Sequence, residues 1–379
     1  MPTSRDAIKD LGATVEAAVP QLARLREAAA GAPIYLVGGA VRDLLLGRER
    51  LDLDVVVEGD AAAVAARLDG EPVEHERFAT AKARLGAVEV DLAGARTETY
   101  PRPGALPEVS PADLERDLAR RDFTINAMAI SLAAEPELID PHGGRADLDR
   151  GVLRVLHDRS FVDDPTRALR AARYAARFGF AVEPGTGELL READLGTVSG
   201  DRVRAELLRV ASEPDAVQAL GLVAIWQLLG PRPDAGRLLP AVDALTSGPP
   251  WDEIADRPRA LVAAGFGPAG REVELTGSEP QRPSDAVEAT RAASPEELVL
   301  ARALGAEWLD PLVIEWRNVA LEIGGQDLLD AGVPEGPAIG RGLAVAKRRK
   351  LDGEISGREQ ELRAALEAAR DESASGAPR

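Results

Sequence analysis

Two aspartates one residue apart carry the strongest chemical signal in the sequence. Asp52 and Asp54 lie in an apolar, β-branched run from Leu51 to Val57, whose composition predicts a buried strand. Residues i and i+2 share one face of a strand, so we expect both carboxylates to point the same way. Adjacent carboxylates repel each other and are costly to bury unless a cation neutralises them. The pair therefore predicts a site for a divalent metal ion.

The simplest alternative places both aspartates on a solvated edge strand. The preceding sequence favours a site instead, because the apolar run Ile34 to Val37 ends at Gly38-Gly39, where missing Cβ atoms allow close backbone approach, and a helical turn follows. Asp91, in another strand-like run, is a candidate third carboxylate, since two-metal phosphoryl transfer holds its cations about 3.5–4 Å apart. Mg²⁺ prefers oxygen ligands, which carboxylates and substrate phosphates supply. The pattern is typical of a nucleotidyltransferase palm.

A second polar cluster lies in RRDFTINAMAISL, residues 120 to 132. Arg120 and Arg121 are forked donors suited to triphosphate oxygens, and Asp122 and Asn126 are suited to a ribose hydroxyl. Taken alone, the same cluster is explained by helix capping and salt bridges. Its interpretation as a nucleotide site depends on the other motifs.

A row of arginines follows a pair of acids further along the chain. Asp163 or Asp164 is placed to cap a helix with Pro165 in its first turn. Four arginines then recur every three or four residues on one side: Arg167, Arg170, Arg173 and Arg177. A solvated charged face would have the same spacing, but such a row also suits a nucleotide and an RNA backbone. An Asp-x-x-Arg pair presents an acceptor beside a donor fork, which is suited to reading the edge of a base.

The segment between Asp91 and the second cluster is rich in proline. Residues Arg96 to Val109, RTETYPRPGALPEV, contain three prolines and a glycine, which predict a mobile loop without regular structure beside the catalytic strands. Loops in such positions often act as lids. An ordered proline-rich connector is the alternative. Elsewhere, apolar spacing from Ile8 to Leu25 predicts one amphipathic helix, and Phe78 to Leu92 predicts two strands joined near Gly86.

Composition limits the classes of protein. The 379 residues, 45% of them hydrophobic, are enough for two or three domains. A net charge of −18 excludes nucleic-acid binding through overall charge, so any RNA contact must use local basic patches. The absence of cysteine excludes disulfide partners and thiolate metal sites and makes a cytoplasmic location the default. Its three histidines are too scattered for a zinc site, and we expect neither a signal peptide nor a membrane partner.

Several stretches together resemble the class II tRNA nucleotidyltransferases and bacterial poly(A) polymerases. The matching stretches are VGGAVRD (Val37 to Asp43), DLD (Asp52 to Asp54), RRDFTINAMA (Arg120 to Ala129), IDPHGG (Ile139 to Gly144), DDPTRALRAARYAARFGF (Asp163 to Phe180), SGDRVRAELLRV (Ser199 to Val210) and, more weakly, GGQDLLDAGVPEGPAIG (Gly324 to Gly340) followed by LDGEI. They occur in the family's order along most of the chain, which makes the combination highly specific.

The resemblance implies an α+β protein, with a nucleotidyltransferase-type mixed-sheet head followed by an all-α neck, body and tail. The corresponding boundaries are an N-terminal helix at 1–30, the head at 31–157, the neck at 158–230, the body at 231–300 and a tRNA-binding tail at 301–379. Within the tail, the basic cluster Lys347-Arg348-Arg349-Lys350 is a candidate contact for tRNA phosphates. From sequence alone, an exposed helix face is the slightly better explanation of this cluster.

The resemblance also implies roles for individual residues. Asp52 and Asp54 would bind catalytic Mg²⁺, and Asp91 stands where the family has its third carboxylate. The nucleotide would be bound by the turn and motif residues Gly38, Gly39, Arg42, Asp43, Arg121, Asp122, Asn126, Asp163, Asp164, Arg167, Arg170 and Arg173, and Arg177 would contact tRNA. Asp164 and Arg167 match the family's base-selecting pair for CTP and ATP, although its usual EDxxR is DDxxR here, with Asp163 one methylene shorter than glutamate.

The implied reaction adds C, A or both to the 3′ end of tRNA from CTP and ATP, with release of pyrophosphate. Enzymes that add CCA, only CC or only A share these motifs, as do poly(A) polymerases. A non-catalytic RNA-binding relative is disfavoured by the intact aspartates. A nucleotidyltransferase for small molecules would not need the arginine row. We further expect the loop at Arg96 to Val109 to gate the change from C to A addition, as its position in the family implies.

Overall fold

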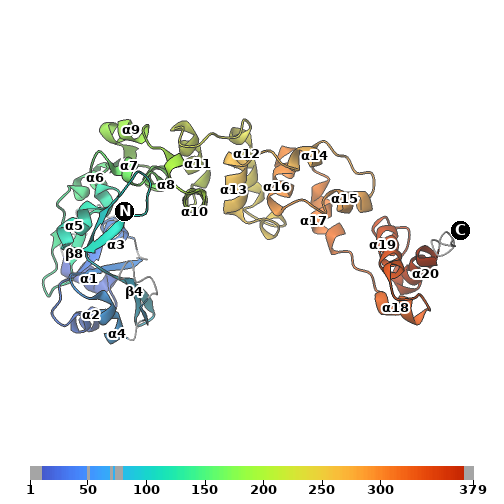
Figure 1. The fold of residues 1–379 in the computed structure, drawn as a ribbon, viewed down its shortest axis with the longest axis horizontal. Coiled ribbons are helices and arrows are strands. Elements are labelled where there is room, and N and C mark those ends of the chain that lie inside the picture. Colours follow the sequence, from blue (N-terminus) through green and yellow to red (C-terminus); the bar gives the residue numbers. More distant parts are fainter. Residues whose placement is uncertain (1–10, 49–51, 69–70, 73–79, 371–379) are drawn as a thin grey trace. The chain divides into compact units, whose positions relative to one another are not determined.

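The computed structural model describes residues 11–48, 52–68, 71–72 and 80–370 (Figure 1). Within it the chain forms two compact units, Met1–Gly230 and Pro231–Arg379. This division falls where the sequence predicts the change from neck to body. The expected starts of the first helix at Ile8 and of a strand at Phe78 lie outside the described residues.

A seven-stranded mixed sheet, in the order β3-β4-β5-β2-β1-β8-β9, forms the centre of the first unit. Its strands are β1 (Ile34–Val37), β2 (Leu53–Val57), β3 (Glu71–Pro72), β4 (Thr80–Leu85), β5 (Val88–Gly94), β8 (Ala129–Ser131) and β9 (Leu138–Ile139). The pair β2 and β5 is parallel, and the other neighbouring strands are antiparallel. Register places Asp54 opposite Asp91 and Asp91 opposite Lys82. Directly paired residues share a face, so these three charged side chains form a row across the sheet.

Short helices pack around this sheet, and their first turns follow capping rules. They are α3 (Gly39–Leu45), α4 (Ala61–Arg67), α5 (Leu114–Ala119), the 3₁₀ turn η1 (Thr124–Asn126) and α6 (Gly144–Arg150). Asp60 caps α4, because its carboxylate accepts a hydrogen bond from the N–H of Ala63 at 3.0 Å. On α5, Leu114 and Leu118 join a buried cluster that includes Val37 and Val56 of the sheet. This packing fixes the segment that follows α5 beside β1.

The prediction of one N-terminal helix is wrong. Two helices, α1 (Leu11–Ala18) and α2 (Leu22–Ala29), are separated at Pro20 and Gln21. Proline cannot donate a helical hydrogen bond, and Gln21 has a positive φ of 53°, which ends the helical geometry. The apolar spacing nevertheless continues across the break, since Val15, Val19, Leu22 and Leu25 are all buried.

The prediction of an irregular loop from Arg96 to Val109 is wrong at both ends. Strands β6 (Arg96–Thr99) and β7 (Glu108–Pro111) form a two-stranded antiparallel ribbon. The three prolines of the segment lie in the connection at 100–107, where they remove no hydrogen bond from the ribbon. This connection is also anchored, because the N–H of Gly104 donates to the Val162 carbonyl at 3.2 Å.

Helices from the remainder of the first unit pack around α8 (Thr166–Phe178). The other elements are α7 (Ser160–Asp163), α9 (Pro184–Leu190), η2 (Leu195–Thr197), α10 (Gly200–Ala211), α11 (Ala216–Ile225) and the parallel pair β10 (Val152–Leu153) and β11 (Ala181–Val182). Helix α8 contacts both α10 and α11 and buries its apolar side. Tyr174 of α8 meets Phe123 edge to face, with ring centroids 5.8 Å apart. This contact joins the neck to the segment behind the sheet.

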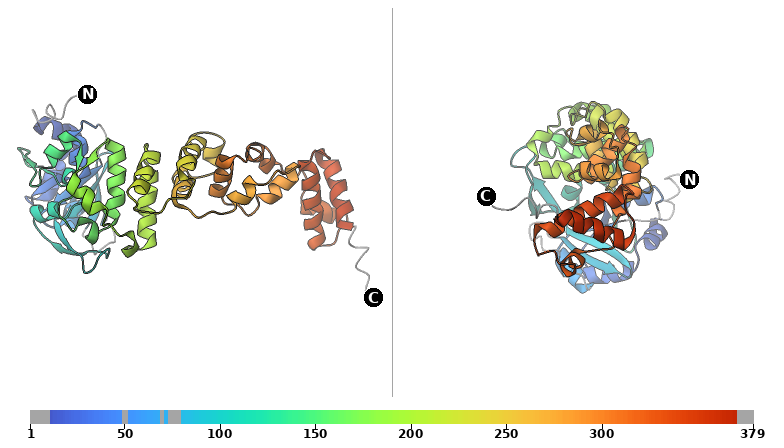
Figure 2. Two further views of the ribbon diagram at one scale, coloured as in Figure 1. Left: turned by 90° about the horizontal axis from the view of Figure 1, so that it is seen from above. Right: turned by 90° about the vertical axis from the view of Figure 1, so that its right-hand side faces the viewer.

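All regular elements described in the second unit are helical. They are α12 (Ala235–Leu245), η3 (Trp251–Glu253), α13 (Arg257–Phe266), α14 (Glu272–Thr276), α15 (Pro283–Ala289), α16 (Pro295–Leu304), α17 (Leu309–Ile314), η4 (Trp316–Asn318), α18 (Gly325–Asp330), α19 (Pro337–Leu351) and α20 (Gly357–Arg370). The predicted boundary between residues 300 and 301 falls inside α16 and does not divide the unit there. Helices α18, α19 and α20 share a separate core, and α19 and α20 lie side by side (Figure 2).

These elements confirm the predicted α+β class, with a mixed sheet followed by helices. Within the described ranges, every helix is too short or too polar to traverse a lipid bilayer.

Phe123 is fully buried between the sheet and α8, and its truncation tests this packing. Phe123→Ala should lower the free energy of unfolding of the first unit by about 3–5 kcal/mol, because it removes a large side chain and leaves a cavity. Urea titration followed by circular dichroism measures the change. Leu106→Ala is the control: its side chain is 53% exposed, so we expect a change within about 0.5 kcal/mol. Equal effects of the two substitutions would contradict this description of the core.

Candidate active site

A pocket of about 440 Å³ in the first unit collects side chains from the sheet edge, the ribbon and α8. The predicted site residues that line it are Gly38, Gly39, Arg42, Asp43, Asp52, Asp54, Arg121, Asp122, Asn126, Asp164, Arg167, Arg170, Arg173 and Arg177. Four further polar side chains line the pocket: Glu98, Tyr100, Arg120 and Tyr174. Of these, only Arg120 was suggested by the sequence, as a donor to triphosphate oxygens. Asp91, Asp163 and the basic cluster of α19 are not among its lining residues.

A continuous chain of buried polar side chains forms one wall of this pocket. Arg42 donates to both oxygens of Asp43, each at 3.0 Å, and to Asn126 Oδ1 at 2.5 Å. Asn126 Nδ2 in turn donates to Asp122 Oδ1 at 2.9 Å. The other oxygen of Asp122 lies 2.6 Å from an Nη atom of Arg170 on α8. These predicted nucleotide-binding residues therefore bind one another, and they connect α3, η1 and α8.

The charges of this wall are strongly coupled. Burial by itself raises the pKa of Asp122, but Arg170 and the hydrogen bond from Asn126 outweigh burial and lower that pKa. Asp122 in turn raises the pKa of Arg170 despite the burial of the guanidinium. Both groups are thus held in their charged forms at neutral pH. A buried pair of this kind is costly to break from one side, because the remaining charge has no partner.

Aromatic rings on α8 contact Arg42 of this wall and a further arginine, Arg173. The Arg42 guanidinium lies 5.3 Å from the centroid of Tyr174 and 4.8 Å from that of Phe178, within the range of cation–π attraction. Arg173 lies 4.7 Å from Tyr174 and also pairs with Glu213 at 3.3 Å. Sequence reasoning did not assign Tyr174 to the site. Its spacing of seven residues from Arg167 on one helix was the available signal.

The predicted arginine row is only partly free for a ligand. Glu213 pairs with Arg177 at 3.5 Å as well as with Arg173, so it neutralises part of the row. By contrast, the buried Nε atoms of Arg121, Arg170 and Arg173 have no hydrogen-bond partner within the described residues. All three side chains line the pocket. Because these Nε atoms have almost no accessible surface, the pocket presents the positive charge of the three guanidinium groups to an anionic ligand rather than a free Nε donor.

Asp52 and Asp54 lie at another part of the pocket, with Asp54 partly buried and Asp52 exposed. The pKa of Asp54 is raised to about 6, chiefly by burial and further by Asp91 and Asp52, against the opposing effect of Arg121 and Lys82. Such mutual repulsion is relieved by a cation, and hard oxygen donors fit Mg²⁺. Within the described ranges, however, no three acidic or histidine side chains are close enough together to hold a metal ion. Asp91 instead pairs with Lys82 at 3.2 Å.

A glycine at position 38 is required by Arg121. Gly38 has a φ of 66°, and a Cβ atom there would lie 2.5 Å from Nη1 of Arg121. The other Nη atom of Arg121 donates to the buried Asp117 at 2.8 Å, and Arg120 donates to the second oxygen of Asp117. Asp117, which the sequence analysis did not single out, therefore positions both arginines of the RRD motif.

Within the described residues, only one carboxylate oxygen of Asp164 accepts hydrogen bonds. Its Oδ1 atom accepts hydrogen bonds from the Thr166 N–H at 3.2 Å, the Thr166 hydroxyl at 2.7 Å and Arg202 Nη2 at 3.0 Å. Asp164, rather than Asp163, therefore accepts from the first residue of α8. Arg202 also donates to the Gly104 carbonyl at 2.8 Å, which ties the ribbon connection to the same place. Sequence reasoning matched the motif around Arg202 but gave this residue no role.

Arg167 is fixed by two neutral acceptors rather than by Asp163. It donates to Ser160 Oγ and to the Arg120 carbonyl, each at 2.8 Å. Asp163 accepts from Arg159 at 2.9 Å and does not line the pocket. Within the described residues no hydrogen bond or ion pair joins Asp163 to Arg167, so the shorter side chain of the DDxxR motif does not act on Arg167 through a direct contact. Arg167 and Asp164 do line the same pocket.

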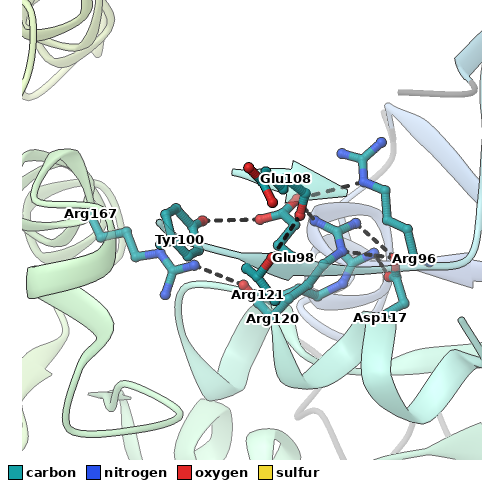
Figure 3. Close-up of polar contacts among 9 residues, drawn as sticks. Arg96, Glu98, Tyr100, Glu108, Asp117, Arg120, Arg121 and Arg167 are labelled. Carbon is teal, nitrogen blue, oxygen red and sulfur yellow. Dashed lines mark hydrogen bonds and ion pairs between the residues drawn. The ribbon is translucent and has the colours of Figure 1, made fainter. Parts of the chain in front are cut away.

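Figure 3 shows how the ribbon reaches the pocket. Glu98 accepts from Arg120 Nη1 at 2.8 Å and from the Tyr100 hydroxyl at 3.0 Å. Burial and the adjacent Glu98 raise the pKa of Tyr100 to about 12, so its hydroxyl stays protonated as a donor. Once Arg96 to Thr99 is known as a strand, alternation places Arg96 and Glu98 on one face. The sequence analysis missed this pattern because it treated the segment as a loop.

The basic cluster on α19 belongs to the second unit and is largely paired. Lys350 donates to the buried Glu361 at 2.5 Å, Arg348 pairs with Asp285 at 3.3 Å, and Arg349 pairs with Glu367 at 3.3 Å. Contact between this cluster and tRNA stays a prediction. The pairing indicates that Lys350 stabilises the packing of α19 on α20.

Comparison with known proteins identifies relatives of this chain. Residues 34–154 match the family model described as the poly A polymerase head domain. The chain is 36% identical over 366 residues to a CC-adding tRNA nucleotidyltransferase of Deinococcus radiodurans, covering 90% of the chain and 91% of that protein. It is 44% identical over 213 residues to an A-adding tRNA nucleotidyltransferase of Halalkalibacterium halodurans, covering 52% of the chain and 50% of the relative. The chain spans half or less of the length of three A-adding relatives it matches.

Solved structures of CCA-adding enzymes have the same fold. The Thermotoga maritima CCA-adding enzyme complexed with tRNA matches with a TM-score of 0.71 and 30% identity, over 94% of this chain and 97% of that one. A CCA-adding enzyme complex with CTP matches with a TM-score of 0.74 and 29% identity, over 94% and 97% of the two chains. A complex with ATP matches with a TM-score of 0.71 and 30% identity, over 92% and 94%.

Because the pKa of Asp54 is raised, replacing its carboxylate with a neutral side chain should increase the free energy of unfolding by an amount that depends on pH. The folded state binds this proton more tightly than the unfolded state, whose value is near 3.8, so ionisation destabilises the fold as the pH rises from about 4 through about 6. In EDTA, Asp54→Asn should therefore raise the free energy of unfolding at pH 7.5 by about 1–2 kcal/mol, and the gain should shrink towards pH 4.5. Urea titrations at both pH values measure it.

The matched control is Asp52→Asn, which neutralises the exposed aspartate of the same strand end. We expect a smaller gain from it, since water already solvates that carboxylate. An Asp54→Asn protein that is no more stable than the unmodified protein at pH 7.5 would contradict the assigned electrostatics.

Proposed function

Because the chain belongs to the family of tRNA nucleotidyltransferases and poly(A) polymerases, we propose that it adds C, A or both to the 3′ end of tRNA. The substrates are CTP and ATP, the acceptor is the terminal 3′-hydroxyl of tRNA, and the leaving group is pyrophosphate. Addition of CC only, addition of A only and poly(A) synthesis are the alternatives, because all of them use the same pocket chemistry.

The observation that carries this proposal is the set of chemical groups that line one pocket. Asp52 and Asp54 supply oxygen donors, the arginines supply positive charge, and Asp164 and Arg167 present an acceptor and a donor fork. A nucleoside triphosphate has a complementary set, namely a metal-binding triphosphate, anionic oxygens and a base with donors and acceptors. The fit supports a nucleotide as the ligand.

Asp164 provides a physical basis for choosing C and A. Its Oδ1 atom accepts three hydrogen bonds, and no hydrogen bond to Oδ2 occurs within the described residues. A free carboxylate oxygen accepts from an exocyclic amino group, which cytosine carries at N4 and adenine at N6. Uracil and guanine carry a carbonyl oxygen there, which the carboxylate repels. Selection then requires no nucleic-acid template, because Ser160 and the Arg120 carbonyl fix Arg167.

The protein contributes mainly positioning and electrostatics. Asp52 and Asp54 would hold Mg²⁺ together with substrate phosphates, and the bound metal would supply activation of the 3′-hydroxyl and neutralisation of charge at the α-phosphate. Asp117 holds Arg120 and Arg121 beside these carboxylates, where they stabilise the negative charge that builds on the leaving pyrophosphate. Asp91, which lies opposite Asp54 in the sheet, would be a further ligand of this metal if it separated from Lys82.

Removal of one carboxylate tests the proposed reaction. Asp52→Ala should lower transfer of labelled CMP or AMP to tRNA by at least about 10³-fold, because a metal ligand is lost, while tRNA affinity changes less than about two-fold. Primer extension and filter binding measure the two quantities. Glu89→Ala removes an exposed carboxylate elsewhere on the sheet and should keep full activity. Undiminished transfer by Asp52→Ala would mean that the catalytic carboxylates are wrongly assigned.

The ribbon connection provides a test of the change from C to A addition. Pro101→Ala together with Pro103→Ala loosens residues 100–107 while leaving the paired strands intact. Terminal A addition should fall several-fold more than CC addition, because Arg202 ties this connection to the base-selecting Asp164. Single-nucleotide gels with acceptors ending before C and after CC measure both steps. If the double variant leaves both steps unchanged, the connection does not gate this change.

A further inference from the structure

A second pocket of about 350 Å³ lies on the other side of Asp54. It shares Asp54, Arg120 and Arg121 with the first pocket. Its remaining polar residues include Lys82 and Asp91, and most of the rest are aliphatic residues of the sheet, such as Val55 and Leu92. Asp54 therefore lines both a pocket rich in arginine and a second, more apolar pocket that adds Lys82 to the shared Arg120 and Arg121.

Lys82 is the cation of this second pocket that is held most weakly. Arg120 and Arg121 are already bound to the buried Asp117. The Lys82 ammonium instead lies 3.2 Å from Asp91, and both side chains are 57% exposed. Ion pairs this exposed contribute about 0–1 kcal/mol, so an anionic ligand readily displaces the partner.

Two substrates must meet at the shared carboxylate in the proposed transfer, and this inference rests on that function. The arginines of the first pocket match the several charges of a triphosphate. The second pocket offers apolar surface for a nucleoside and a single, flexible ammonium for a single charge. We propose that the second pocket receives the 3′-terminal nucleoside of the acceptor RNA and that Lys82 binds the phosphodiester preceding it.

This contact has a consequence for Asp91. When Lys82 binds the acceptor phosphodiester, Asp91 loses its ion-pair partner and becomes available beside Asp54. Arrival of the acceptor thereby changes the charge around the catalytic carboxylates before transfer. Lys82 acts here as a positioning residue for the acceptor.

The test compares two cations on the same strand. Lys82 and Arg84 both lie on the exposed face of β4, and each pairs with a carboxylate of β5 directly opposite, Asp91 and Glu89. Arg84 is not among the residues that line the second pocket. Lys82→Met should raise the KM for a tRNA acceptor-stem minihelix by about five- to ten-fold while the KM for the nucleotide stays unchanged. Arg84→Met should change neither, and Lys82→Arg should recover most of the loss.

A modified acceptor makes the test specific for the phosphodiester. With a minihelix whose last phosphodiester is a methylphosphonate, the unmodified protein and Lys82→Met should have the same KM, because the charge that Lys82 binds is gone. A penalty that persists with this acceptor, an equal penalty from Arg84→Met, or an unchanged KM for Lys82→Met would each overturn the inference. The unmodified protein is assayed first: if it extends no tRNA acceptor, the proposed function fails as well, whereas normal extension with an unaffected Lys82→Met overturns the inference alone.

Discussion

The buried chain that runs from Arg42 through Asn126 and Asp122 to Arg170 is the interaction on which the site depends. Its members come from α3, η1 and α8, and Arg42 and Asn126 are 84 positions apart in the sequence. A charge taken out of water must be paired, and the buried Asp122 has its charge partner in Arg170, whose side chain is 35% exposed. The three elements are therefore held together by electrostatic necessity as well as by packing. Asn126 is central because its amide both accepts from a cation and donates to an anion.

The same chain determines which groups are left for a ligand. Residues that match nucleotide-binding motifs, such as Arg42 and Asp122, hydrogen-bond to other protein side chains, here both to Asn126. Together they form the pocket wall. Side chains held by this wall or by Asp117 line the pocket with positive charge, as Arg121 and Arg170 do. The protein carries a net charge of −18, yet the pocket is lined by arginines, so positive charge is concentrated locally within an acidic chain.

The sequence predicts the parts of the site that follow local periodicity. Asp52, one residue before β2, and Asp54 within it line one pocket, and the arginines of α8 line the same pocket because helical spacing repeats every three or four residues. The close approach at Gly38-Gly39 was also predictable, because glycine has no Cβ atom. In the structure Gly38 leaves room for the side chain of Arg121, which follows α5. The resemblance to a family added the order of the domains.

Features set by long-range pairing were not predictable in this way. Glu98 and Tyr100 came to the pocket only because β6 pairs with β7, and the prolines that suggested a loop lie outside that pairing. Lys82 meets Asp91 through sheet register, which no local pattern specifies. Asp163 and Asp164 are adjacent and chemically identical, so only the structure distinguishes the one that faces the pocket. Pro20 indicated a break between α1 and α2, but the uninterrupted apolar spacing led to the prediction of a single helix.

The central claim is that this pocket selects C and A for addition to the 3′ end of tRNA. The most direct measurement is incorporation of each labelled nucleotide, CTP, ATP, UTP and GTP, with Mg²⁺ into tRNA transcripts ending before CCA, after C and after CC, resolved to single nucleotides. The account predicts that C, A or both are added at the correct positions, that addition then stops, and that U and G are rejected. A long A tail, equal use of UTP, or no incorporation into any transcript would contradict it.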